Sequence, residues 1–93
     1  MLGSQIAEAE EYKRCRQVEQ ALTKGQLKVL RAFAEGKTPK EVAGSLVISP
    51  STVSTHLTSI FHQYRIAWNL PESYSLDYHF LREKFARYFH QDE

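Results

Sequence analysis

The sequence predicts an all-α fold, a small helical bundle that contains a helix-turn-helix. Apolar residues recur at steps of three and four along several segments, which is the period of an amphipathic helix. The same helix start, a hydroxyl residue followed by proline, occurs at Thr38-Pro39 and again at Ser49-Pro50. The hydroxyl caps a helix, and proline suits its first position. With 93 residues, 42% of them apolar, the chain can build one core but not two. We therefore expect a single domain over residues 1–93.

The first helix is expected over residues 4–21, with Ser4 as its cap. Its apolar stripe is thin and consists of Tyr12, Cys15, Val18 and Leu22. Glutamates in the early turns suit the positive end of the helix dipole. A thin stripe on a terminal helix predicts packing against a neighbour, either within the chain or on a second copy.

The next helix is expected to begin at Thr23 and to end near Glu35. Gly36 follows at the position where a left-handed residue closes many helices. The buried stripe of this helix consists of Leu27, Leu30, Phe33 and Ala34. Its cationic residues Lys24, Lys28 and Arg31 lie outside that stripe.

A helix-turn-helix is predicted directly after it. Thr38 opens a helix of about two turns, and Ser49 opens a longer one of about four turns over residues 50–64. The apolar residues of the pair are Val42, Ala43 and Leu46, then Val53, Leu57, Ile60 and Tyr64. A short helix, a tight turn and a longer helix together indicate this motif.

The outer face of the longer helix carries short hydroxyl side chains. They are Ser51, Thr52, Ser54, Thr55, Thr58 and Ser59, and no charged residue occurs between positions 49 and 59. Short hydroxyls let a helix approach another surface closely and can hydrogen-bond to base edges or phosphate oxygens. A solvated polar face is the alternative, although such faces usually carry Glu, Lys and Arg. We favour contact with a nucleic acid.

Charge is distributed unevenly along the chain. The net charge is +1, but residues 22–66 hold six basic and two acidic residues, whereas the segments on either side are net acidic. A local positive excess suits phosphate binding. The overall pI near 7.9 argues against a strong non-specific binder.

A connector over residues 67–75 separates this motif from a last helix, expected over residues 76–89 with Ser75 as its cap. The last helix is rich in aromatic residues, and one face consists of Tyr78, Leu81, Phe85 and Tyr88. Aromatic side chains are enriched both in cores and at the centres of interfaces. These residues can complete the internal core, but we expect them to form a dimer interface, with help from the first helix.

Several classes of protein are disfavoured. No apolar run is long enough to cross a bilayer, the N-terminus lacks a secretory pattern, and the lone Cys15 cannot form an internal disulfide. We therefore expect a cytoplasmic protein without a membrane partner. The histidines have no metal-ligand spacing, and neither a phosphate-binding glycine loop nor a nucleophile elbow is present. We expect no metal, no other cofactor and no enzymatic activity.

Residues 22–66 resemble the LuxR/FixJ-type (GerE-like) helix-turn-helix family. The matching elements are Leu22-Thr23, Val29-Leu30, Ala34-Glu35-Gly36, Lys40-Glu41-Val42-Ala43, Leu46, Ile48-Ser49 and Thr52-Val53 with His56, in the order and spacing of that family. The resemblance implies a four-helix DNA-binding domain whose third helix enters the major groove. It also implies a homodimer that acts in transcription control.

The resemblance also suggests site residues. Thr52, Thr55 and His56 match positions that meet DNA or support that contact, and Lys40 matches a position beside the DNA backbone. Helical geometry adds Ser51 and Thr58 to the groove-facing set, and Ser54 belongs to the same hydroxyl face. We expect Lys37, Lys40 and Arg31 to neutralise phosphates. The chain departs from the family at Gly25 and Gln26, where a basic and an acidic residue are usual, at Lys28, where an acidic residue is frequent, and at Ser54, where lysine is common.

We therefore expect a sequence-specific transcriptional regulator that binds double-stranded DNA through residues 50–64 and acts as a homodimer. The alternative is a protein-interaction module, in which the helix-turn-helix is a scaffold and the aromatic last helix docks a partner protein.

Overall fold

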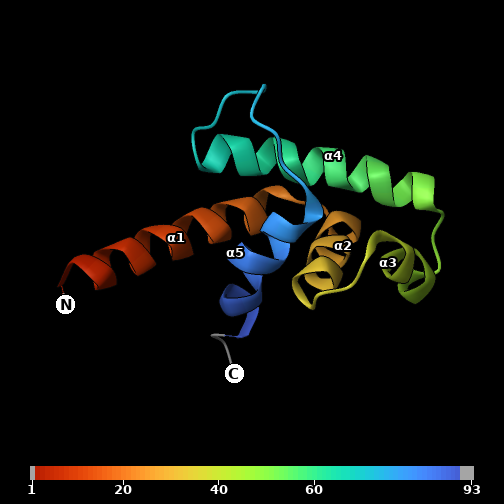
Figure 1. The fold of residues 1–93 in the computed structure, drawn as a ribbon, viewed down its shortest axis with the longest axis horizontal. Helices are drawn as coiled ribbons and strands as arrows, with labels where there is room; N and C mark the ends of the chain where they lie inside the picture. Colours follow the sequence, from red (N-terminus) through yellow and green to blue (C-terminus); the bar gives the residue numbers. More distant parts are fainter. Residues whose placement is uncertain (1, 91–93) are drawn as a thin grey trace.

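The computed structural model describes the backbone of residues 2–90 and the side chains of residues 9–90, and this part of the chain is helical without strands. Its helices are α1 (Leu2–Ala21), α2 (Lys24–Ala34), α3 (Pro39–Leu46), α4 (Pro50–Ala67) and α5 (Tyr78–His90) (Figure 1). The expected all-α bundle with a helix-turn-helix is therefore confirmed, with α3 and α4 as the two helices of the motif.

The expected capping residues begin the three central helices. The Thr23 hydroxyl accepts a hydrogen bond from the backbone N–H of Gln26, whose side chain accepts one from the N–H of Thr23. Thr38 and Glu41 form the same reciprocal box at α3, and these hydrogen bonds lower the pKa of the Glu41 carboxyl. At α4 the Ser49 hydroxyl accepts from the third residue along. Each helix start is thus decided by residues within one turn of it.

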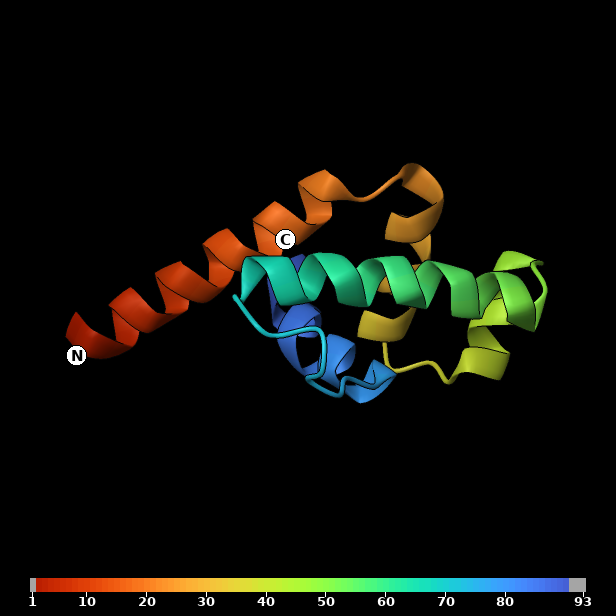
Figure 2. The same cartoon turned by 90° about the horizontal axis from the view of Figure 1, so that it is seen from above.

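α2 lies at the centre of the bundle. α4 crosses above it, α3 packs beside both, and α5 packs on the other side of α2 (Figures 1 and 2). The largest fully buried side chains come from all five helices of the described chain. They are Val18, Val29, Leu30, Phe33, Val42, Val53, Ile60, Leu81 and Phe85. A single core therefore joins the family-like segment to both terminal helices.

α1 begins away from the rest of the fold and packs through its second half. Its N-terminal turns extend to one side in both ribbon views (Figures 1 and 2). Cys15 and Val18 are buried against α4 and α5. Lys84 of α5 donates to the carboxylate of Glu11 across 2.8 Å. Packing within the chain, one of the two alternatives for this helix, is what the structure contains.

Two helix boundaries differ from those expected. α4 continues past residue 64 to Ala67, and Asn69 then turns the chain with a positive φ of 55°. α5 begins at Tyr78 rather than at residue 76, because the Asp77 carboxylate accepts a hydrogen bond from the N–H of His79. Asp77, and not Ser75, therefore takes the capping role at this helix.

The aromatic face of α5 is turned inward, toward the chain's own helices. Leu81 and Phe85 are fully buried and Tyr88 is 8% exposed, all against the chain's own helices. Tyr78 is half-buried, with its ring 5.4 Å from that of Phe33. Most of this apolar area is therefore covered inside one chain. The assignment of these four residues to a dimer interface, and of the same helix to a partner protein, stays a prediction.

No helix in the described part of the chain is long and apolar enough to cross a membrane. The described residues also contain no group of three or more His, Cys, Asp or Glu side chains that could hold a metal ion.

Candidate nucleic-acid interface

The hydroxyl-rich face of α4 lies open. Its buried side consists of Val53, Ile60 and Tyr64, which pack into the core. On the opposite side the residues Ser51, Ser54, Thr55 and Thr58 are exposed. Neither α1 nor α5 covers them, so the N-terminal half of α4 presents an open surface to a partner.

The hydroxyls on this face fall into two chemical types. Thr55 donates to the backbone carbonyl of Ser51 and Thr58 donates to that of Ser54, each across 3.1 Å. The two threonines therefore present acceptor lone pairs and methyl groups outward. Within the described residues, Ser51 and Ser54 make no side-chain hydrogen bond, so their O–H groups can donate. This face can offer donors, acceptors and methyl contacts, which are the groups that read base edges.

Thr52 and His56 have supporting positions. The Thr52 hydroxyl lies 2.9 Å from that of Ser49, and its side chain is half-buried at the start of α4. His56 is also half-buried and lies over the first turn of α2, where a Cβ built on Gly25 would be 3.7 Å from the imidazole. Thr52 thus contacts the cap of its own helix, whereas His56 lies between α4 and α2.

The predicted phosphate ligands differ in availability. Lys40 is exposed and forms no ion pair with any described residue. Lys37 is paired with Glu35 across 2.7 Å. Arg31 is paired with Glu19 across 3.5 Å, and its guanidinium lies 4.7 Å from the ring centre of Phe89. The structure thus places Arg31 between α1 and α5 and leaves Lys40 as the one of the three without an ion pair to a described residue.

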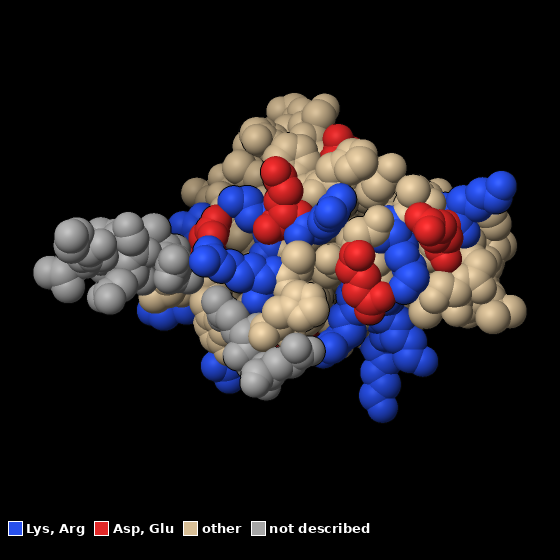
Figure 3. Space-filling view, turned by 60° about the horizontal axis from the view of Figure 1, so that its bottom comes forward, with Lys and Arg blue, Asp and Glu red and all other residues tan. Residues whose placement is uncertain are grey.

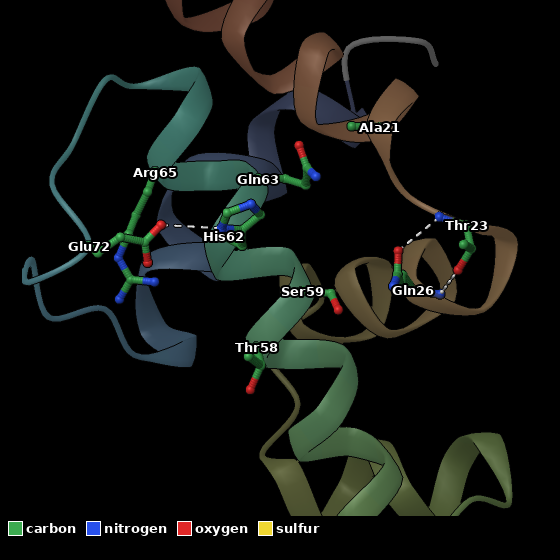
Figure 4. A pocket seen from close by; sticks show the side chains of 9 residues that line it. All are labelled: Ala21, Thr23, Gln26, Thr58, Ser59, His62, Gln63, Arg65 and Glu72. Atoms are coloured by element: carbon green, nitrogen blue, oxygen red, sulfur yellow. Dashed lines mark hydrogen bonds and ion pairs between the residues drawn. The ribbon is translucent and has the colours of Figure 1, made fainter.

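A shallow hollow of about 560 Å³ continues from the open face of α4 (Figure 4). Its walls are the end of α1, the start of α2, the C-terminal half of α4 and the connector. The lining residues are Ala21, Thr23, Gln26, Thr58, Ser59, His62, Gln63, Arg65 and Glu72. Thr58 belongs both to this hollow and to the hydroxyl face, so the two surfaces are contiguous.

Two interactions at this hollow were not predicted from the sequence. Arg65 donates to the backbone carbonyl of Tyr74 from Nε at 3.1 Å and from Nη2 at 2.8 Å. Glu72 pairs with His62, with 3.3 Å between Oε1 and Nδ1. Both interactions join α4 to the connector, and no spacing signal in the sequence relates a loop residue to a particular helical partner.

The lower face of the molecule has a different electrostatic character. Basic and acidic side chains are interspersed over it (Figure 3). A phosphate backbone needs a surface of one sign, so mixed charges disfavour this face as a nucleic-acid track. The uncharged face of α4 is the better candidate.

The comparisons with known proteins concern this same segment. A family model described as bacterial regulatory proteins of the luxR family (GerE) matches residues 20–67. The transcriptional regulatory protein LiaR of Bacillus subtilis (strain 168) is 42% identical over 48 residues, which cover 52% of this chain and 23% of the relative. The chain therefore spans less than a quarter of that relative's length. No solved structure gave a significant match. Because the family model covers more than half of the chain and includes α2, α3 and α4, the chain belongs to the luxR family of bacterial regulatory proteins.

Proposed function

We propose that this protein is a transcriptional regulator that binds double-stranded DNA in a sequence-specific manner, with α4 in the major groove. The observation that carries the proposal is the open, uncharged hydroxyl face of α4, within the segment that matches the family. A major groove of about 12 Å admits one α-helix, and short side chains allow the helix to enter deeply. The relative's name as a transcriptional regulatory protein supports the same function.

The proposed contacts follow from the available groups. Ser51 and Ser54 donate to acceptor atoms of the bases. Thr55 and Thr58 accept from base amino groups or pack their methyl groups on thymine. Lys40 binds a phosphate. Lys37 can bind another after release from Glu35, so the two lysines anchor the start of α3 on the DNA backbone. Thr52 and His56 keep α4 in register.

Selection of bound duplexes from a random pool, read at two salt concentrations, tests the proposal. An enriched sequence is expected, with log affinity falling against log salt by about 0.9 for each phosphate contacted. A chain that enriches no sequence and binds no duplex even at low salt would refute it.

The family resemblance further predicts a homodimer. In such a dimer two α4 helices would meet successive major grooves, about 34 Å apart, and the selected site would be a palindrome. An interface on α5 would require Leu81, Phe85 and Tyr88, which are covered within the monomer, to become exposed. Sedimentation of the free protein and of its DNA complex would count the copies. The proposed binding of DNA is also consistent with the cytoplasmic location expected from the sequence.

A further inference from the structure

We propose that the connector, which in the structure consists of residues 68–77 between α4 and α5, lowers the affinity of this protein for DNA by holding Glu72 over the hollow beside α4. The inference rests on the proposed function, because the hollow is where the phosphate strand bordering the major groove would pass. The connector lies beyond the segment that matches the family, which ends at residue 67. Its effect would therefore be a property of this chain rather than of the shared domain.

The connector is held firmly on the side of α4 where the hydroxyl face lies open. It rises above the C-terminal end of α4 before it crosses the helix toward α5 (Figure 1). Trp68 stacks on Tyr64 with ring centres 4.3 Å apart, and the N–H of Leu70 donates to the carbonyl of Arg65 across 2.8 Å. The Arg65 guanidinium donates two hydrogen bonds to the backbone carbonyl of Tyr74. These contacts fix both ends of the turn that carries Glu72.

Glu72 is the acidic residue in a lining that is otherwise neutral or basic. The neutral polar groups come from α2 and α4 and include Thr23, Ser59 and Gln63, while the basic groups are His62 and Arg65. Hydroxyl, amide and cationic groups of this kind are the ones that hydrogen-bond to phosphate oxygens. A carboxylate placed in it repels the same phosphates.

Glu72 also occupies the nearest basic side chain. Its carboxylate points toward the imidazole of His62 (Figure 4), with 3.3 Å between Oε1 and Nδ1. A histidine that binds this carboxylate cannot use Nδ1 as a donor to a phosphate. Removal of the carboxylate would therefore end a repulsion and release a phosphate ligand at the same time.

The test compares Glu72→Gln with Glu10→Gln on a duplex recovered from the random pool. Glu10 is exposed on α1, so its substitution makes the same change in net charge away from the hollow. Exposed charge interactions of this kind correspond to about a two- to fivefold change in the dissociation constant. We expect Glu72→Gln to bind more tightly by that factor and Glu10→Gln to bind as the wild type does. An unchanged affinity of Glu72→Gln, or equal tightening in both variants, would overturn the proposal.

A double-mutant cycle with His62→Gln tests the role given to the imidazole. We expect the gain from Glu72→Gln to fall by at least half when residue 62 is Gln. If His62 gains a phosphate contact in Glu72→Gln, the dependence of log affinity on log salt becomes steeper in that variant. In the double variant, which lacks His62, this dependence should return toward that of the wild type. An undiminished gain would overturn the assignment of His62 as the released ligand. If the wild type and every variant fail to bind any duplex, it is the proposed function that fails, so the two outcomes are distinguishable.

Discussion

Tyr88 of α5 donates a hydrogen bond to the carboxylate of Glu19 in α1, although 69 positions separate the two residues. Both side chains have further partners there. Arg31 pairs with the other oxygen of Glu19, and the ring of Tyr12 lies 5.1 Å from that of Tyr88. This junction docks the first helix on the last and explains why the aromatic face of α5 is part of the core.

The first prediction concerns that junction. Tyr88→Phe keeps the ring but removes the donor, and a hydrogen bond to a charged group contributes about 1.5 to 3 kcal/mol. Because Glu19 keeps Arg31, we expect the free energy of unfolding to fall by about 1.5 kcal/mol in urea denaturation. Tyr74→Phe is a matched control, since Tyr74 is 43% exposed and uses its backbone rather than its hydroxyl in the Arg65 contact. Equal stability of Tyr88→Phe and the wild type would contradict the assignment.

The second prediction concerns Val47, which closes α3 with a φ of 55° and is 89% exposed. A β-branched residue is disfavoured in this left-handed region, whereas asparagine tolerates it. Val47→Asn loses no packing, so we expect it to stabilise the protein by about 1 kcal/mol. Asn69 has the same φ, and Asn69→Val should destabilise the protein by a similar amount. Thermal denaturation measures both variants, and shifts of the same sign would contradict the explanation.

The third prediction compares alanine at two glycines. A Cβ at Gly25 would make ordinary contact with His56, so Gly25→Ala should stabilise the start of α2 by about 0.5 kcal/mol. Gly36 has a φ of +94°, and a Cβ there would lie 3.4 Å from Nε of Arg82. Gly36→Ala should therefore destabilise the protein by more than about 1 kcal/mol. Denaturant midpoints should move in opposite directions.

The fourth prediction concerns alkaline pH. Burial raises the pKa of the Cys15 thiol from its ordinary 9.0 to about 12, and that of the Tyr64 phenol from 10.0 to about 12. Between about pH 9 and 12 the unfolded chain releases these protons while the folded chain keeps them. The free energy of unfolding must then fall as pH rises through this window. Urea midpoints at pH 8, 9, 10 and 11 measure the loss, and Cys15→Ala should flatten its first part. A midpoint that stays constant to pH 11 would show that these groups titrate alike in both states.

The fifth prediction tests the reading face. Ser54→Ala removes an exposed donor, and we expect DNA affinity to fall by about three- to tenfold, near the loss of one good contact to a base. Ser45→Ala, on the exposed side of α3, is the control that should leave affinity unchanged. Circular dichroism verifies that both variants fold. Full affinity of Ser54→Ala for a selected duplex would exclude Ser54 from the interface.

The parts of this protein that the sequence by itself determined are local. Thr23, Thr38 and Ser49 each begin a helix through hydrogen bonds to the residue three positions later. The starts of these helices, and with them the helix-turn-helix, therefore follow from residues that are close in the sequence. The hydroxyl face of α4 follows from helical spacing alone. For the same reason, the family could be recognised from the order of its short motifs.

The tertiary structure decided every relation between distant segments. Spacing indicated that α5 has an apolar face, but only the packing of α1, α2 and Trp68 around it placed that face in the core. Tertiary contacts also decide the position of the connector. The hydrogen bonds from Arg65 to the carbonyl of Tyr74 hold it against α4, and Glu72 is thereby placed beside His62. The physical reason is that a periodic pattern tells which side of a helix avoids water, whereas the covering partner is chosen by shape and by hydrogen bonds across the fold.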